Sequence, residues 1–190
     1  MTEKTRCAWC LASEKETLYH DSEWGVPVHD DQKLFECLTL ESAQAGLSWA
    51  TILNKREGYQ KCFAKFNIKK VAEFDLDKIE TLLQDASIVR HRQKIEATIN
   101  NANRILEVQK EFGSFDTFIW EIVGGEPIQN NCKTLDDVAS KTELSDMLCK
   151  KLKKHGFKFV GTTICYAFMQ AAGMVNDHVT DCFRYQEVQV

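Results

Sequence analysis

The stretch Lys150–Cys182, KKLKKHGFKFVGTTICYAFMQAAGMVNDHVTDC, decides how this chain folds. Just before and inside it, Leu148 and Leu152 lie at i and i+4, which places both on one face of a helix. Gly156 stands where a left-handed residue would end that helix. The pattern predicts a helix that is apolar on one face and basic on the other, where it carries the lysines at 150, 151, 153 and 154.

The turn that follows spans 157–161 and leads into an apolar helix over Ile164–Ala172, which Thr162 or Thr163 can cap. A tight turn with Gly161 at the start of a helix exposes backbone N–H groups that can hold one phosphate. An ordinary helical hairpin with solvated lysines explains the same letters. The pattern alone therefore leaves open whether this hairpin binds anything.

Length and composition indicate a helical protein. The 190 residues suffice for one domain with a proper core, and only 2 Pro and 9 Gly interrupt them. Hydrophobic residues make up 44% and charged residues 27%, as in ordinary globular proteins. No apolar run approaches the length of a membrane span, and the start MTEKTRCAWC lacks the apolar core of a signal peptide. We therefore expect a cytoplasmic all-α protein, with one domain over residues 1–190.

Capping residues and apolar spacing place the remaining elements. The chain up to about Val28 reads as irregular, and Gly124–Lys133 reads as a loop. Helices are predicted from Asp30 or Asp31 through Leu40, from Trp49 to about Phe63 after Ser48, after Asn67, after Asp75, over Val89–Phe112 before Gly113, and over Phe115–Val123 after Ser114.

The formal net charge of −4 argues against a large electrostatic footprint on nucleic acid. A local footprint is still possible, because positive residues gather at Arg90–Lys94 and Lys150–Lys158. Eight cysteines in a chain expected to be cytoplasmic suggest thiols or a metal site, since disulfide frameworks belong to oxidising compartments.

The two ends of the chain carry the residues that a closed metal site needs. Two sulfurs and two imidazoles form a tetrahedral zinc site with no open position for water, and such a site would join the termini. Cys10 competes with Cys7 for this role, and His29 competes with His20. A buried thiol or a hydrogen-bonded histidine also explains any one of these residues. The candidate ligands are Cys7, His20, His178 and Cys182.

A second group of candidate residues surrounds the break between two apolar helices at Gln44–Leu47. Small residues let a flat ligand approach the backbone, Trp49 offers an aromatic face, and Glu41 can accept hydrogen bonds or attract a cation. The alternative is a plain helix corner with Trp49 in the core and Glu41 in solvent. The chemistry of these residues alone does not exclude that alternative.

Six longer motifs resemble the constitutive (type I) 3-methyladenine DNA glycosylase family. They occur in the family's order and span the chain from Cys7 to Cys182. Cys10 is an extra cysteine outside the family pattern, and the tail FRYQEVQV after Cys182 matches nothing. The motifs are CAW, YHDSEWGVP, LESAQAGLSWATIL, IVRHRQKI, GFKFVGTTICYAFMQAAG and NDHVTDC.

The resemblance implies a helix-hairpin-helix DNA glycosylase fold, with the motif at about 143–173 and with one structural Zn²⁺ per chain clamping residues 7–20 to 178–182. Residue by residue, it assigns the zinc to Cys7, His20, His178 and Cys182. It assigns the base pocket to Trp9, Tyr19, Glu41 and Trp49, with Glu41 as the catalytic residue. It assigns the contacts to DNA to Phe159, Val160, Gly161 and Thr162.

The resemblance also implies the reaction: hydrolysis of the N-glycosidic bond of 3-methyladenine in double-stranded DNA, by a monomer with no membrane partner. Bifunctional relatives use a lysine beside the hairpin as a nucleophile. Thr162 and Thr163 stand there instead, so we expect no lyase activity. Many related glycosylases place a catalytic aspartate after the second hairpin helix, where this chain has Asp177, and the resemblance implies that Asp177 does not act in that way.

Two other classes of function compete with this interpretation. A non-catalytic DNA-binding module with structural zinc would need no cluster of Tyr19, Glu41 and Trp49. A zinc hydrolase or deaminase would need an open metal position and, for a deaminase, an H-x-E motif with P-C-x-x-C, and the sequence contains neither motif. Release of free base from methylated DNA distinguishes the glycosylase from both.

Overall fold

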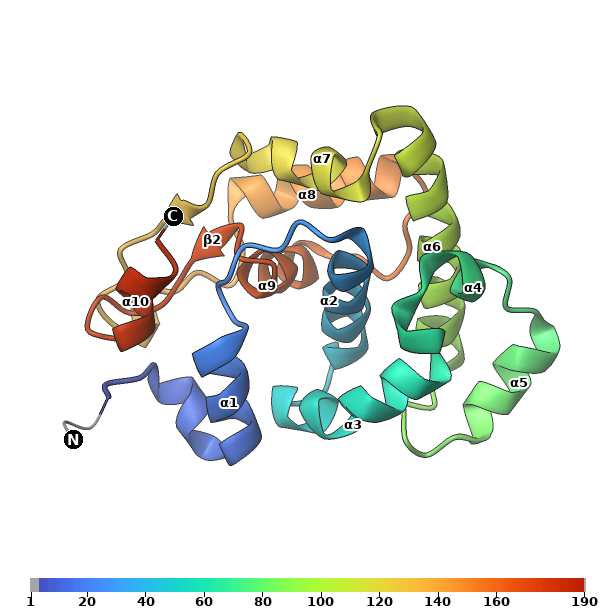
Figure 1. Cartoon of the computed structure of the whole chain (residues 1–190), viewed down its shortest axis with the longest axis horizontal. Coiled ribbons are helices and arrows are strands. Elements are labelled where there is room, and N and C mark those ends of the chain that lie inside the picture. Colours follow the sequence, from blue (N-terminus) through green and yellow to red (C-terminus); the bar gives the residue numbers. More distant parts are fainter. Residues whose placement is uncertain (1–3, 190) are drawn as a thin grey trace.

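Residues 4–189 are described by a computed structural model, and helices account for nearly all of its regular structure (Figure 1). This confirms the predicted all-α class. The helices are η1 (Ala8–Ala12), α1 (Glu14–Ser22), α2 (Asp31–Gln44), α3 (Trp49–Cys62), η2 (Ala64–Phe66), α4 (Ile68–Ala72), α5 (Leu76–Gln84), α6 (Arg92–Phe112), α7 (Phe115–Trp120), η3 (Glu121–Val123), η4 (Leu135–Asp137), α8 (Glu143–Lys154), α9 (Thr162–Ala171) and α10 (Phe183–Glu187), where η denotes a 3₁₀ helix.

Side-chain caps begin most of the helices that the sequence predicts. In each case the side-chain oxygen accepts a hydrogen bond from the backbone N–H three residues later, which satisfies one of the free donors of the first turn. Because such a cap is local, its position could be recognised from the sequence. The capping residues are Asp30, Ser48, Asn67, Asp75 and Ser114.

One prediction is wrong for the segment before Val28. An irregular segment was expected there, and the structure contains η1 and α1. The sequence of α1, EKETLYHDS, has no apolar stripe that periodicity could reveal. Ser13 caps this helix by accepting the Glu16 N–H at 3.2 Å. The helix buries mainly Tyr19 and His20. Both are candidate site residues, so α1 serves the site more than the core.

The predicted cap of the second hairpin helix also differs. Gly161 is the N-cap of α9, so Thr162 lies inside the first turn and its Oγ1 contacts Ser145 Oγ of α8 at 3.1 Å. Lys151 is one of the lysines predicted on the basic face of the first hairpin helix, and solvated lysines were one interpretation of that face. Its Nζ instead donates to the Phe118 carbonyl oxygen at 2.6 Å, which links α8 to α7.

The centre of the molecule is formed by α2 and α9, with α6 along one side and α7 and α8 across the top (Figure 1). Phe35 and Leu38 of α2 and Phe168 of α9 are fully buried in one continuous core. Gly173 ends α9 with φ +68°, and a Cβ there would lie 2.3 Å from the Val26 carbonyl carbon. This close approach holds the segment after α1 against the end of α9.

The last residues return to the start of the chain. Strands β1 (Ile128–Gln129) and β2 (Val175–Asn176) pair in parallel, and the Phe183 N–H donates to the Thr5 carbonyl oxygen at 3.0 Å. As a result the start of α10 lies close to α1, with the ring centroids of Phe183 and His20 6.3 Å apart (Figure 1). The tail that matched no motif is thus part of the folded structure, with Tyr185 and Val188 buried. No helix within residues 4–189 has the length and apolar character that crossing a membrane requires.

Candidate functional site

A cleft of about 250 Å³ opens between α1, α2, α3 and α9. All four residues assigned to the base pocket, Trp9, Tyr19, Glu41 and Trp49, line it together. The sequence analysis missed other lining residues, although Trp24 lies inside the quoted YHDSEWGVP motif and Gln44 inside the helix break. The additional residues are Trp24, Gln44, Leu135, Val138, Ala167 and Gln170.

Glu41 lies in the last turn of α2 and is only 6% exposed, so it is not the solvated carboxylate of a plain helix corner. No hydrogen bond from the described part of the chain reaches its carboxyl group. Burial raises the pKa of Glu41 to about 8, because the apolar surroundings disfavour the charged form. A buried carboxyl group without a partner, in an open cleft, indicates a site for a hydrogen-bonding or cationic ligand.

Aromatic rings form the walls of the cleft. The ring centroids of Tyr19 and Trp49 are 5.1 Å apart, as are those of Trp9 and Trp24. The indole N–H groups of Trp9 and Trp49 are buried without an acceptor among the residues that the structure describes. Unpaired buried donors are costly, so this arrangement favours a flat ligand with polar edges.

The end of α2 is held by a buried cation. Lys94 of α6 donates to the carbonyl oxygens of Ala43 at 2.8 Å and Ala45 at 2.7 Å, which are otherwise free at a helix C-terminus. Lys94 is 8% exposed. Lys94 is therefore not part of the positive surface that the sequence suggested for Arg90–Lys94. It instead supports the rim of the cleft from inside the protein.

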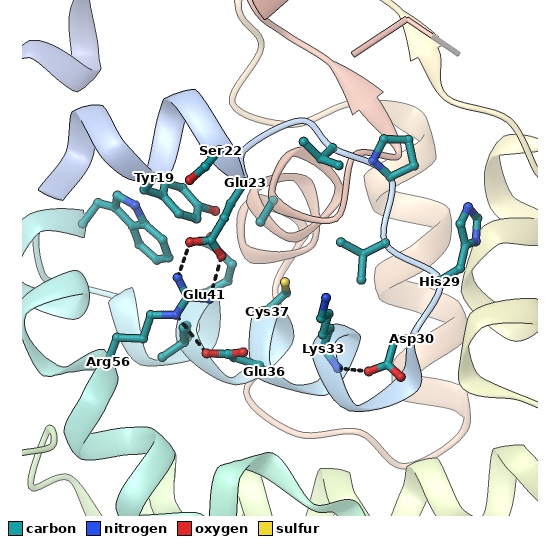
Figure 2. A pocket seen from close by; sticks show the side chains of 16 residues that line it. Tyr19, Ser22, Glu23, His29, Asp30, Lys33, Glu36, Cys37, Glu41 and Arg56 are labelled. Carbon is teal, nitrogen blue, oxygen red and sulfur yellow. Dashed lines mark hydrogen bonds and ion pairs between the residues drawn. The ribbon is translucent and has the colours of Figure 1, made fainter. Parts of the chain in front are cut away.

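A second cavity, of about 270 Å³, shares Tyr19, Glu41 and Trp49 with the cleft. Figure 2 shows this cavity, with Cys37 and Lys33 on α2 beside it. Arg56 of α3 lies at its edge and binds the carboxylates of Glu23 and Glu36. The three shared side chains thus form a thin wall between two hollow regions.

The hairpin, residues 157–161, joins α8 to α9. Phe159 adopts φ +58° and is half-buried, while the side chain of Val160 is buried, so only the backbone of Val160 is available to a ligand. Asn101 of α6 holds the hairpin through a reciprocal pair of bonds, accepting the Lys158 N–H at 2.8 Å and donating to the Lys158 carbonyl oxygen at 3.0 Å.

The N–H groups at the start of α9 have no protein acceptor within residues 4–189. These groups belong to Gly161, Thr162 and Thr163, and the open space next to Gly161 contains no atom within 4 Å of a Cβ built there. A helix N-terminus with free N–H groups and a free approach has the chemistry of a phosphate site.

The four residues proposed as metal ligands come together at the joined termini. Their ligand atoms all lie within 4.8 Å of one another, and all four residues are buried. The set is Cys7, His20, His178 and Cys182. Cys10 is excluded from it, because its thiol donates to the Cys7 carbonyl oxygen at 3.1 Å, and His29 lies elsewhere, 2.7 Å from Asp116. The 178–182 segment contains a turn, and this turn brings His178 and Cys182 to one side.

The donor set fits a zinc ion. Tetrahedral zinc with ordinary bond lengths places sulfur and nitrogen ligands about 3.5 Å apart. Here Cys182 Sγ lies 3.4 Å from His20 Nε2, and His178 Nδ1 lies 3.7 Å from each sulfur. The hydrogen bond from Cys7 lowers the pKa of Cys182, and the same bond raises the pKa of Cys7.

In both histidines, the ring nitrogen that faces away from the cluster also has a hydrogen-bond partner. His20 Nδ1 lies 2.8 Å from Asp21 Oδ1, and His178 Nε2 lies 3.0 Å from the Trp24 carbonyl oxygen. These contacts point the other nitrogen of each ring at the cluster, as in natural zinc sites. Because Trp24 also lines the cleft, the cluster and the cleft share a wall.

Asp177 is buried and does not face the cleft freely. Its carboxylate accepts hydrogen bonds from Asn130 Nδ2 at 2.6 Å, Tyr166 Oη at 2.8 Å and Gln170 Nε2 at 2.7 Å. A carboxylate held by three donors is a structural centre. Through Gln170 it also supports one wall of the cleft.

Comparison with known proteins identifies close relatives. A model of the methyladenine glycosylase family matches residues 9–185. The chain is 50% identical over 180 residues, 95% of its own length and 96% of the relative's, to DNA-3-methyladenine glycosylase 1 of Escherichia coli. It is 47% identical over 178 residues, or 94% and 96% of the two chains, to DNA-3-methyladenine glycosylase of Haemophilus influenzae.

Solved structures agree with these sequence matches. A crystal structure of 3-methyladenine DNA glycosylase I has a TM-score of 0.92 at 50% identity, over 94% of this chain and 98% of that one. The Staphylococcus aureus enzyme, in a study of its recognition of 3-methyladenine, has a TM-score of 0.91 at 38% identity, over 94% and 95%.

Proposed function

This chain belongs to the methyladenine glycosylase family, and from that premise we propose how its cleft performs the family's reaction. The protein is a DNA-3-methyladenine glycosylase of base-excision repair. It hydrolyses the N-glycosidic bond of 3-methyladenine in alkylated DNA and releases the free base. The observation that best supports the assignment of the cleft is Glu41, a buried carboxyl group without a partner among aromatic rings.

The base must leave the duplex to reach Glu41. A cleft lined by rings cannot enclose a stacked nucleotide, so the lesion is turned out of the helix, at a cost that is lower for a damaged base. Trp49 and Tyr19 then cover the faces of the base, Trp9 lines the cleft beside them, and Glu41 lies at the edge of the base. These substrate contacts are our assignment for the four residues.

Bond cleavage follows from the charge of the lesion. Alkylation at N3 makes the adenine cationic within DNA, so the base already leaves readily and needs little acid catalysis. The aromatic faces attract this cation. Its arrival beside Glu41 favours the carboxylate over the acid, since an opposite charge lowers a carboxyl pKa. Glu41 thereby becomes a charged acceptor for the base edge and can orient the water that attacks the sugar.

DNA is held, we propose, by the hairpin as a helix-hairpin-helix element, through N–H groups at Val160, Gly161 and Thr162 with Phe159 beside them. The cation that Lys94 contributes is buried, which supports a small phosphate footprint. With Thr162 and Thr163 beside the hairpin in place of a lysine, we expect a monofunctional enzyme that leaves an abasic site. We further propose that it acts as a monomer in the cytoplasm.

A structural zinc is proposed for Cys7, His20, His178 and Cys182, one ion per chain. Its chemistry there is to cross-link the two ends of the chain, since four protein ligands leave no position for water. The cluster holds the Trp24 wall and α1 in place, and α1 carries Tyr19. The zinc site thus supports the pocket without taking part in the reaction.

The decisive experiment is chromatographic detection of bases released from methylated DNA. Wild-type protein should release 3-methyladenine, and 7-methylguanine much more slowly, because a guanine edge presents a keto acceptor where Glu41 needs a donor. The product DNA should contain an abasic site that the enzyme does not cut. DNA binding with no released base would instead favour the non-catalytic binding module.

A further inference from the structure

The three side chains in the wall of the cleft come from three different helices. Tyr19 belongs to α1, Glu41 to α2 and Trp49 to α3. No hydrogen bond within the described chain fixes the carboxyl group of Glu41 or the hydroxyl group of Tyr19. Their mutual placement therefore depends on how the three helices are held against one another.

One side chain ties these three helices together. Arg56 of α3 donates from Nη1 and Nη2 to the two carboxylate oxygens of Glu23, both at 2.7 Å, and from Nε to Glu36 Oε1 at 2.9 Å (Figure 2). Glu36 lies on α2. Glu23 is the C-cap of α1, and its backbone N–H donates to the Tyr19 carbonyl oxygen at 2.9 Å. A planar guanidinium is suited to this task, because it makes a bidentate pair and still has a third donor.

Arg56 lies close enough to the wall to affect its shape. It lines the second cavity together with Tyr19, Glu41 and Trp49, and it follows Trp49 by two turns on the same helix. Its side chain is 24% exposed and that of Glu36 is 15% exposed, so this pair is partly shielded from water, whereas the side chain of Glu23 is 45% exposed. Gln60 also donates to Glu36 Oε1, at 3.0 Å, which holds the acceptor in place.

We propose that Arg56 is a positioning residue for base excision: by holding α1, α2 and α3 together it sets the spacing of Tyr19, Glu41 and Trp49 around the flipped base, without touching the base itself. This inference rests on the proposed function of the cleft. Arg56 acts through geometry, because its charge is matched by two carboxylates. In agreement, burial alone accounts for the raised pKa of Glu41.

Arg56→Lys tests geometry against charge, since lysine keeps the positive charge but lacks the planar fork that makes a bidentate pair with Glu23 while also bonding to Glu36. We expect the single-turnover rate of 3-methyladenine excision to fall about 10- to 100-fold, as for small misplacements of reacting groups. Affinity for free 3-methyladenine should weaken in parallel. Affinity for abasic DNA should stay unchanged, because the hairpin is untouched. A purely structural role would lower the melting temperature but leave the rate of the folded protein unchanged.

Arg104→Lys is the matched control. Arg104 has a similar side-chain exposure, 33%, and its ion pair with Glu107 stays within one helix. This variant should excise at the wild-type rate. Glu36→Gln is a milder second variant in case Arg56→Lys does not fold. It weakens only the link to α2 and should give a smaller loss of the same kind.

The outcomes separate this inference from the function on which it rests. If wild-type protein releases no 3-methyladenine, the proposed function is wrong, whatever Arg56 does. If wild type is active while folded Arg56→Lys and Glu36→Gln both excise at the wild-type rate, Arg56 is not a positioning residue. A loss of affinity for abasic DNA equal to the loss of rate would also overturn the inference.

Discussion

At the scale of single residues, Glu41 combines two properties that rarely occur together. It is buried, yet no described group neutralises it or donates to it. A buried carboxyl group without a partner lowers the free energy of unfolding of the protein. Groups with strongly shifted pKa values are common at functional sites, where they bind ligands. Two predictions concern this residue and the ring beside it.

The stability of the protein should depend on pH through Glu41. Its pKa is about 8 when folded, against 4.5 for an ordinary glutamate, so between these values the unfolded chain loses the proton and the folded protein keeps it. Stability is therefore fully present below about pH 4.5 and falls as pH rises toward 8, by at most ~1.4 kcal/mol per pH unit. Urea unfolding of wild type and Glu41→Gln at pH 5 and 7.5 measures this.

The difference in free energy of unfolding between wild type and Glu41→Gln removes the contributions of all other titrating groups, because only residue 41 differs between the two proteins. Relative to wild type, the variant should be more stable at pH 7.5 than at pH 5. A difference that is the same at both pH values would show that Glu41 is solvated in the folded protein.

Trp49→Ala should weaken binding of free 3-methyladenine by ~1–3 kcal/mol, the range for stacking a base on an aromatic ring, and should slow excision as well. Trp49→Phe keeps a ring and is the control, with most of the affinity retained. Titration followed by intrinsic fluorescence or NMR gives both affinities. Normal binding by Trp49→Ala would remove Trp49 from the base pocket.

Among the secondary-structure elements, α8 and α9 pack their apolar faces inward, and the turn that connects them carries the buried side chains of Phe157 and Val160. Val160 packs inward and Asn101 holds the neighbouring Lys158, so the hairpin is a rigid edge and not a mobile loop. N–H groups that are already held in place at a helix start lose little conformational entropy when they bind a phosphate. DNA can therefore be held by few such contacts.

Gly161→Glu tests this anchor. The change places bulk and a negative charge where we propose that a phosphate binds, so affinity for abasic DNA should fall at least several-fold. Gly161→Ala is the control, because its Cβ would meet no atom within 4 Å and its φ of −114° suits any residue. The affinity of wild type should depend only weakly on salt, as expected for few neutralised phosphates. Normal DNA binding by Gly161→Glu would place the DNA elsewhere.

At the scale of the whole molecule, the chain closes on itself. Cys7 and His178 are 171 positions apart in the sequence, yet Cys7 Sγ lies 3.7 Å from His178 Nδ1. A cross-link between such distant residues restricts the unfolded chain most strongly, and metal binding adds its free energy to folding. The clamp also links the termini to the Trp24 wall of the cleft.

Cys182→Ser should therefore lose zinc and melt at a lower temperature, while any folded, zinc-loaded fraction keeps its excision activity. Cys10→Ser is the matched control: it alters a buried thiol in the same region that is outside the ligand set, and it should keep one zinc per chain. Elemental analysis and thermal unfolding provide the measurements. Absence of zinc from wild type, or full zinc in a Cys7 and Cys182 double variant, would contradict the proposed site.

Elements with local signals could be predicted from the amino-acid sequence. Asp30, Ser48 and Ser114 each bond to a backbone N–H three residues ahead, so the helix starts could be predicted from neighbouring letters. The long motifs, through their resemblance to a family, also predicted which residues would gather at the cleft and the termini. Spacing alone left Cys10 and His29 as candidates, because ligand geometry is not encoded in the distance along the chain.

Contacts between segments that are distant in sequence could not be predicted and became visible only in the folded protein. Lys94, which was grouped with the surface cations, is buried and binds the end of α2. Helix α1 forms in a segment without apolar periodicity. Arg56 binds both Glu23 and Glu36 and so connects three helices. The physical reason is common to all three. Burial and pairing of a polar group depend on which other segments pack against it, and that is settled by the folded chain as a whole.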